Sequence, residues 1–191
     1  AAATSFFPAK PLGCYGDGGA CFTNDDALKE KLLSLRMHGQ GAHRYEHVVV
    51  GLNSRLDTIQ AAILIEKLKI FDDEIEKRNA VAARYNAAFA ASNRITVPRV
   101  IAGAVSTWAQ YTLQVETRAK FQADLKQAGV PSAVYYPIPL SRQKAYAAYP
   151  SAPTPVSEAL SARVVSLPMH PYMDEATQDR VIAAVLKSVE K

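Results

Sequence analysis

Hydrophobic residues recur at helical spacing in several parts of the chain. The longest such part runs from about residue 57 to residue 91, where apolar side chains follow one face and neither glycine nor proline intervenes. Because this length exceeds that of a typical globular helix, we expect either a break near Asp72 and Asp73 or a helix that bridges two domains. Shorter helices are predicted over residues 27–37, 118–128, 156–163 and from residue 174 onward.

Strands are predicted where β-prone residues lie between turn signals. The predicted strands span residues 4–7, 19–23, 48–50, 108–115, 132–136 and 164–167. From about residue 95 onward strands and helices alternate, which predicts a small α/β unit at the end of the chain. Residues 93–107, with Pro98 and Gly103, are predicted to form a loop.

Composition narrows the class of protein. Of the 191 residues, 49% are hydrophobic, which is typical of a soluble globular protein. No apolar run approaches the roughly 20 residues that cross a bilayer, and no signal-peptide pattern precedes the first helix, so we expect a cytoplasmic protein that does not enter membranes. The net charge of +4 is dispersed along the chain, which argues against nucleic-acid binding.

The two cysteines, Cys14 and Cys21, do not suggest a disulfide framework or a metal site. Two thiols in a chain of this length, without a secretory signal, favour reduced cysteines. Their spacing is not that of metal ligands, and no histidine cluster lies nearby. The sequence therefore predicts no bound metal.

Lys10 lies in a turn-rich stretch between two predicted strands. Pro8, Pro11 and the glycines of residues 16–19 fix the backbone and let it approach a flat ring or a phosphate closely. A rigidly held, partly desolvated lysine amine can form an imine with a carbonyl group, and Ser5 offers a hydroxyl group for a phosphate. From these residues alone, an ordinary surface lysine in a loop is the simpler interpretation.

Several segments, in order along the chain, resemble the DegT-type sugar aminotransferases. The first is the lysine segment, with a serine, two aromatic residues, Lys10 and a Gly-Asp-Gly-Gly turn. The others are the Arg-x-His-Gly stretch, the Gly-x-Asn-x-Arg block, the Tyr-Pro-Ile-Pro-Leu phrase and the Ser-Leu-Pro-Met-His-Pro phrase, at residues 36–39, 51–62, 136–140 and 166–171. Because the order matches along essentially the whole chain, the resemblance is far more specific than any single motif.

The resemblance implies the C-terminal portion of a fold-type-I aminotransferase that depends on pyridoxal 5'-phosphate (PLP). Residues 1–56 would then be the end of the large cofactor-binding α/β domain, residues 57–94 a long connecting helix, and residues 95–191 the small C-terminal α/β domain. The family is homodimeric, with active sites at the subunit interface. A whole enzyme of this family has roughly another domain before the lysine, so we expect this chain to be an incomplete portion that is inactive by itself.

The resemblance also implies roles for single residues. Lys10 would bind the cofactor as a Schiff base and move the proton in the reaction, and Ser5 would hydrogen-bond the cofactor phosphate. Asn53 would reach the phosphate of the neighbouring subunit's cofactor. Arg55 is a candidate for the substrate's anionic groups, which suit a planar bidentate donor, and an ordinary structural ion pair is the equal alternative.

The substrate follows from a branch within the family. Residues 44–47 and the run after them resemble enzymes that aminate UDP-linked 3-oxo-uronic acids, with glutamate as the family's usual donor, for surface polysaccharides such as lipopolysaccharide. Tyr135 and Tyr136 are then candidates for substrate binding. Tyr135 is a departure, because the branch has histidine there and a tyrosine cannot carry positive charge.

Three alternatives remain open. A PLP-dependent sugar dehydratase of the same fold would carry histidine in place of Lys10. A non-catalytic fragment or sensor protein of the same fold would leave Lys10 without a cofactor. An unrelated α/β binding module would match only by chance.

Overall fold

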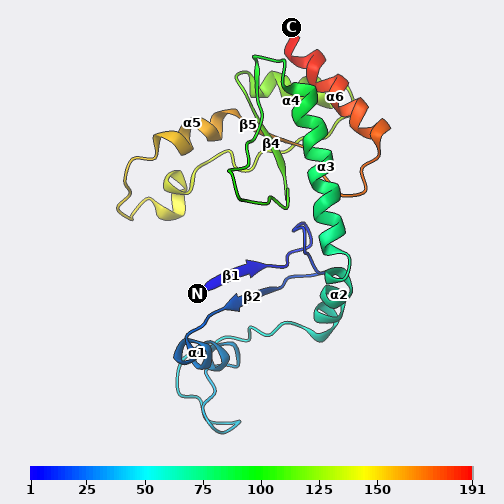
Figure 1. Ribbon diagram of the computed structural model, residues 1–191. Helices are drawn as coiled ribbons and strands as arrows, with labels where there is room; N and C mark the ends of the chain where they lie inside the picture. Colours follow the sequence, from blue (N-terminus) through cyan, green and yellow to red (C-terminus); the bar gives the residue numbers. More distant parts are fainter. Residues whose placement is uncertain (191) are drawn as a thin grey trace. The chain divides into compact units, whose positions relative to one another are not determined.

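The computed structural model describes residues 1–190 of the chain (Figure 1). The chain forms two compact units, Ala1–Asp72 and Asp73–Lys191. This boundary lies inside the range 57–94 that was expected to connect a large and a small domain. The assignment of those domains stays a prediction.

The first unit consists of a two-stranded ribbon followed by two helices. Strand β1 (Ala2–Ser5) pairs antiparallel with β2 (Gly19–Phe22), with Ala2 opposite Phe22 and Ser5 opposite Gly19 (Figure 1). Helix α1 (Asp26–Arg36) begins where the Asp25 side chain accepts a hydrogen bond from the Leu28 amide. Helix α2 (Thr58–Leu68) follows a long loop.

This unit buries little apolar surface of its own. Within Ala1–Asp72, the fully buried hydrophobic residues are Cys14 and Leu64, and many large apolar side chains are exposed instead. An isolated two-stranded ribbon is marginally stable in water unless another element covers a face of it.

The second unit has a continuous hydrophobic core. Its elements are α3 (Phe71–Phe89), β3 (Ile95–Thr96), β4 (Tyr111–Val115), α4 (Arg118–Gln127), the short 3-10 turns η1 (Leu140–Arg142) and η2 (Lys144–Tyr146), α5 (Pro155–Arg163), β5 (Val164–Leu167) and α6 (Glu175–Glu190). The three strands form an antiparallel sheet in the order β3-β4-β5. Side chains of α3, α4 and α6 pack with β4 and β5 in one cluster, whose members Tyr85, Tyr111, Leu113 and Leu125 are fully buried.

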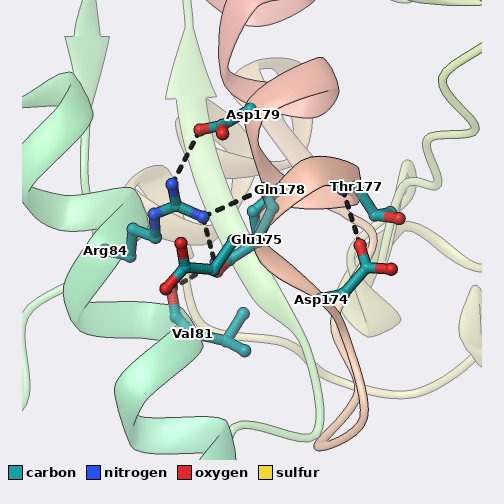
Figure 2. Close-up of polar contacts among 7 residues, drawn as sticks. All are labelled: Val81, Arg84, Asp174, Glu175, Thr177, Gln178 and Asp179. Carbon is teal, nitrogen blue, oxygen red and sulfur yellow. Dashed lines mark hydrogen bonds and ion pairs between the residues drawn. The ribbon is translucent and has the colours of Figure 1, made fainter.

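Polar contacts lock the first turn of α6 against α3 (Figure 2). The Arg84 guanidinium donates to the Glu175 carbonyl (3.0 Å) and to the Asp179 carboxylate (2.8 Å), and the buried Gln178 amide donates to the Val81 carbonyl (3.0 Å). Just before the helix, the Asp174 carboxylate accepts a hydrogen bond from the Thr177 amide. The Thr177 hydroxyl and, after it, this Thr177 amide lower the pKa of Asp174 by hydrogen bonding to the carboxylate.

Several predicted helices and strands are confirmed. The strand predicted over 164–167 is β5, the one over 19–23 is β2, and the helices predicted over 27–37, 118–128 and 156–163 are α1, α4 and α5 within one or two residues. The long helical stretch forms two helices. The helix is interrupted at Lys69 and Ile70, whose amides donate hydrogen bonds to the carbonyls three residues earlier in the chain instead of four. Asp72 and Asp73, where we expected the break, lie instead in the first turn of α3. Negative side chains are stabilised at this end of a helix by the helix dipole.

Four strand predictions need correction. Residues 48–50 form no strand: the Val48 and Val49 amides both point to the Gly39 carbonyl, and Val50 is 97% exposed without a ladder partner. Strand β1 ends at Ser5 rather than at residue 7, because the Phe6 carbonyl turns away to accept from the Cys14 amide.

The remaining corrections concern the second unit, where one predicted loop also contains a short strand. Residues 132–136 make one bridge, from Ala133 to Ser166, because flanking prolines lack the amide donors that a longer ladder needs. Strand β3, in a stretch expected to be loop, is only two residues long and carries no periodic signal. The strand predicted from residue 108 begins at Tyr111.

Neither a membrane-spanning helix nor a metal-binding cluster is found in the described part of the chain. Among residues 1–190, no helix is both long and apolar enough to cross a membrane. Over the same range, no three His, Cys, Asp or Glu side chains gather in a way that could hold a metal ion.

Candidate active site

Lys10 lies in a compact loop, residues 6–18, that joins β1 to β2. The loop closes on itself through its backbone: the Phe6 amide donates to the Gly18 carbonyl (2.7 Å), and the Cys14 amide donates to the Phe6 carbonyl (2.8 Å). A second turn is closed where the Lys10 amide donates to the Phe7 carbonyl (2.8 Å). The Lys10 backbone is therefore held by a turn within a turn, which explains why prolines and glycines crowd this segment.

Gly13 is packed against the turn that carries Lys10. A methyl group added at Gly13 would lie 2.7 Å from the Phe7 and Pro8 carbonyl oxygens and 3.0 Å from the Lys10 carbonyl oxygen. These distances leave no room for a side chain. The backbone at Gly13 and the backbone of the Lys10 turn consequently lie in direct contact.

Cys14 fills the inside of the loop. Its side chain is 1% exposed, and its Sγ lies 3.0 Å from both the Phe6 and the Gly16 carbonyl oxygens. A buried thiol between two acceptors is a small packing group and a weak donor. We therefore assign Cys14 to the structure of the loop rather than to chemistry.

Helix α2 holds the far side of the loop. The Tyr15 amide donates to Oε1 of Gln60 (2.8 Å), and Nζ of Lys67 donates to the Gly13 carbonyl (2.5 Å). Lys67 also lies 5.9 Å from the centre of the Tyr15 ring, within the range of a cation–π contact. The loop is thus fixed both by its own backbone and by side chains 45 and 54 residues further along the chain.

The two predicted cofactor ligands of this loop present their side chains outward. Lys10 is exposed, and among residues 1–190 its ammonium makes no hydrogen bond or ion pair. Ser5, at the end of β1, is also exposed, and its hydroxyl accepts the Phe7 amide (3.2 Å). That hydroxyl keeps its own proton to donate to another group. A primary amine and a hydroxyl thus flank one rigid turn.

Asn53 and Arg55 lie in a different part of the first unit. Residues 52–54 pair with the end of α1, through the Met37–Asn53 bridge and the bond from the Ser54 amide to the Arg36 carbonyl. Nη1 of Arg55 lies 3.3 Å from Nε2 of His38, a geometry in which the imidazole nitrogen accepts. Within residues 1–190 no ion pair of Arg55 with an acidic side chain is found, and its role stays a prediction.

Tyr135 and Tyr136 belong to the second unit and precede Pro137. Both side chains are exposed, with ring centres 5.7 Å apart in an edge-to-face arrangement. Their hydroxyl groups have no hydrogen-bond partner within residues 1–190. His170, in the family-like phrase at residues 166–171, lies in the loop between β5 and α6.

The model of the DegT/DnrJ/EryC1/StrS aminotransferase family matches residues 1–186. The chain belongs to this family. It is 51% identical over 184 residues to the UDP-2-acetamido-2-deoxy-3-oxo-D-glucuronate aminotransferase of Pseudomonas aeruginosa, and the match covers 96% of this chain and 50% of that protein. The chain spans about half the length of the curated relatives that it matches.

Solved structures show the same fold. A family aminotransferase from Brucella abortus superimposes with a TM-score of 0.93 at 52% identity, covering 99% of this chain and 51% of the other. NtdA of Bacillus subtilis, determined with the cofactor PMP bound, superimposes with a TM-score of 0.89 at 28% identity, covering 99% of this chain and 46% of the other. The expected fold, the C-terminal portion of a fold-type-I aminotransferase, is confirmed.

Sequence reasoning missed part of this family member's candidate site. No role was assigned from the sequence to Gln60, which lies in the family-like block 51–62, or to Lys67, although both contact the Lys10 loop. The signal that could have found them is their spacing of seven residues, which places both on one face of a helix. Nothing in the sequence showed that this face meets residues 13–15.

Proposed function

We propose that this chain contributes the cofactor-binding lysine and the small domain of a PLP-dependent aminotransferase that acts on a nucleotide-linked keto sugar. The observation that carries the proposal is Lys10: its backbone is held by two nested turns, while its amine is exposed and unpaired within residues 1–190. Membership of an aminotransferase family and the cofactor PMP in a 28% identical relative support the cofactor assignment.

The residues present fit such a cofactor. Its aldehyde requires a primary amine, which Lys10 offers, and its phosphate requires donors, which the Ser5 hydroxyl and the Asn53 amide offer. When bound, PLP supplies the electron sink for changes at the carbon that carries the amino group. Lys10 would hold the cofactor covalently and, once released, would carry the proton between two carbons.

The substrate proposal depends on charge and on one relative. A UDP-linked uronic acid carries a diphosphate and a carboxylate, and the P. aeruginosa relative is named for such a substrate. Arg55 keeps guanidinium donors beyond the one directed at His38, so we assign it to an anionic group of the substrate, namely the carboxylate, whose two oxygens match a planar donor pair. Tyr135 and Tyr136 would hydrogen-bond the sugar through hydroxyl groups that have no other partner in the described residues.

The finer assignments follow the same proposal. Glutamate is proposed as amino donor, and the product is proposed to enter surface polysaccharide such as lipopolysaccharide. The enzyme is proposed to be a cytoplasmic homodimer in which Asn53 reaches the phosphate of the other subunit's cofactor. The large exposed apolar side chains of the first unit support an association that covers them.

The test uses a longer polypeptide that contains this chain and has the full length of its relatives. Reduction with borohydride in the presence of PLP, followed by peptide mass analysis, is expected to place the pyridoxyl group on Lys10, and Lys10→Ala is expected to remove it. Amination should be measured with glutamate and two substrates, a UDP-linked 3-oxo-uronic acid and the same 3-oxo sugar without the carboxylate. A pyridoxyl group on another lysine, or none at all, would contradict the proposal and favour a non-catalytic protein.

Arg55→Lys provides the matched test of substrate binding. It keeps the charge and loses the planar donor pair, so the KM for the uronic acid is expected to rise about tenfold, because a bidentate hydrogen-bonded contact to a charged group contributes about 1.5 kcal/mol. The KM for the sugar without the carboxylate is expected to change little. Equal effects on both substrates would contradict the assignment of Arg55 to the carboxylate.

A further inference from the structure

Helix α2 presents two side chains to the loop that carries Lys10. Gln60 and Lys67 are seven residues apart, which places them two helical turns apart on one face. Gln60 accepts the Tyr15 amide at 2.8 Å, and Lys67 donates to the Gly13 carbonyl at 2.5 Å. The two contacts lie on either side of Cys14, so a rigid helix holds the loop at two points.

Lys67 is unlike Lys69, the lysine at the C-cap of the same helix. Its side chain is half-buried and directed at a backbone carbonyl 54 residues earlier in the chain. Lys69, two positions on, is exposed and pairs with Glu66 at 2.7 Å within its own helix. An exposed pair of that kind contributes little, whereas a half-buried, charge-assisted bond to a carbonyl is among the stronger hydrogen bonds of a protein.

Gly13 couples this contact to Lys10. The backbone of Gly13 lies so close to the Phe7, Pro8 and Lys10 carbonyls that even a methyl group has no room between them. Because the contact is close-packed, a shift of the Gly13 backbone is transmitted to the turn that carries Lys10. If Gly13 shifts away from Lys67, the turn that carries Lys10 therefore loses its support.

We propose that Lys67 is a positioning residue for Lys10, with Gln60 as the second point of attachment. The chain of contacts runs from Lys67 to the Gly13 carbonyl and from Gly13 to the Lys10 turn. Only the effect of Lys67 on catalysis rests on the proposed function. The structural part of the proposal, that α2 fixes the loop, holds for the protein without cofactor.

The experiment compares three variants of the full-length polypeptide. Lys67→Met removes the ammonium and keeps the apolar stem, and Lys67→Arg keeps a donor for the Gly13 carbonyl. Lys69→Met, at the C-cap of α2, is the matched control. Hydrogen exchange of residues 6–18 is measured without cofactor, and kcat and KM are measured with it. Lys67→Met is expected to speed exchange in this loop and to lower kcat about tenfold, since displacements below 1 Å at a reacting group cost one to two orders of magnitude.

The other two variants sharpen the result. Lys67→Arg is expected to restore slow exchange and most of kcat, and Lys69→Met to leave both unchanged. The KM of each substrate is expected to stay within about twofold in all three, because Lys67 acts on Lys10 and not on the substrate. Unchanged loop exchange and unchanged kcat in Lys67→Met would overturn the proposal.

Two outcomes separate this proposal from the proposed function. If exchange in the loop rises in Lys67→Met but borohydride labels no Lys10, the attachment by α2 is correct and the proposed function fails. If Lys10 is labelled in every variant and Lys67→Met behaves as the unmodified protein, the proposed function stands and the positioning role fails. Should Lys67→Met not fold, Gln60→Leu and Gln60→Glu form the second pair: only Glu keeps the acceptor for the Tyr15 amide and should preserve slow exchange.

Discussion

Gly13→Ala is the change that tests most directly whether backbone packing holds Lys10 in place. The added methyl group would lie 2.7 Å from two carbonyl oxygens and 3.0 Å from a third, the one that belongs to Lys10. All three neighbours are backbone atoms, so no flexible side chain can turn aside. The methyl group can therefore be accommodated only if the turn at residues 7–10 and the backbone at residue 13 move apart.

The distances set the size of the effect. Contacts of this kind relax when the atoms separate by about 0.5 Å, and overpacking of a close-packed site costs about 1–3 kcal/mol. A displacement of about 0.5 Å at Lys10 is expected to lower kcat about tenfold, because a 1 Å error in the position of a reacting group costs about a hundredfold. The substrate contacts are not touched, so KM should change by less than about twofold.

The assay is steady-state transamination by the full-length polypeptide, together with its thermal unfolding. Gly103→Ala is the matched control: its φ of +79° makes alanine unfavourable by about 1 kcal/mol, yet no atom lies within 4 Å of the added methyl group. It should lower the unfolding temperature without a change in kcat. A Gly13→Ala variant with the kcat of the unmodified protein would refute the coupling between Gly13 and Lys10.

Three further predictions concern the second unit. Leu125→Ala removes a fully buried side chain and is expected to cost about 3 kcal/mol, which lowers the thermal midpoint of this unit by roughly 12 °C; a shift below about 3 °C would contradict its place in the core. In urea titrations, Arg84→Met is expected to lower the free energy of unfolding by about 1 kcal/mol, and Asp179→Asn to lower it by less. Only Arg84→Met also loses the hydrogen bond to the Glu175 carbonyl. Hydrogen bonds from the Thr177 hydroxyl and amide lower the pKa of Asp174 below its usual value of 3.8. The stability that this carboxylate contributes is therefore present above pH 4 and is lost as the pH falls through the lowered pKa. The difference in thermal midpoint between the unmodified protein and Asp174→Ala should therefore shrink as the pH is lowered from 6 to 2, and a constant difference would show that the charge is irrelevant.

Local signals in the sequence predicted most of the helices. The Asn-Asp-Asp cluster before α1 and the glycine after α4 are chemical signals within a few residues of the helix ends, and both helices are found where these signals place them. The break between α2 and α3 has no such signal, since Lys69 and Ile70 are ordinary helix residues. The break expected near Asp72 and Asp73 followed only from the length of the helical stretch, which predicts that a break exists but not its exact position.

Strands were less predictable because a strand needs a partner. Residues 48–50 have the strongest β-prone composition of the first unit, yet no neighbouring segment pairs with them. Residues 95–96 are β-branched but form a very short run just before Pro98, so no strand was predicted there, yet they pair with Val115 and Gln114 of β4. Strand propensity describes how a residue fits a sheet surface, and it does not say whether the sheet is there.

The candidate site divides in a similar way. Lys10 and Ser5 could be suggested from the sequence, but only through the resemblance of several ordered segments to a known family, since the residues around Lys10 alone favour an ordinary surface lysine. Gln60 and Lys67 could not, since their contacts with the loop depend on how α2 lies against residues that are 45 and 54 positions away. Arg55 could be suggested as an anion-binding residue, but its contact with His38 became visible only in the structure.

By itself, the sequence determined the chemistry that the protein can offer: one lysine amine in a rigid turn, a hydroxyl beside it, and the helices and turns whose signals are local. Backbone angles and capping depend on neighbours within about four residues, so these features can be derived from the order of residues alone. Only the tertiary structure decided what holds Lys10 in place. Gly13 meets the Lys10 turn, and Lys67 meets Gly13, through contacts between distant segments that no local pattern encodes.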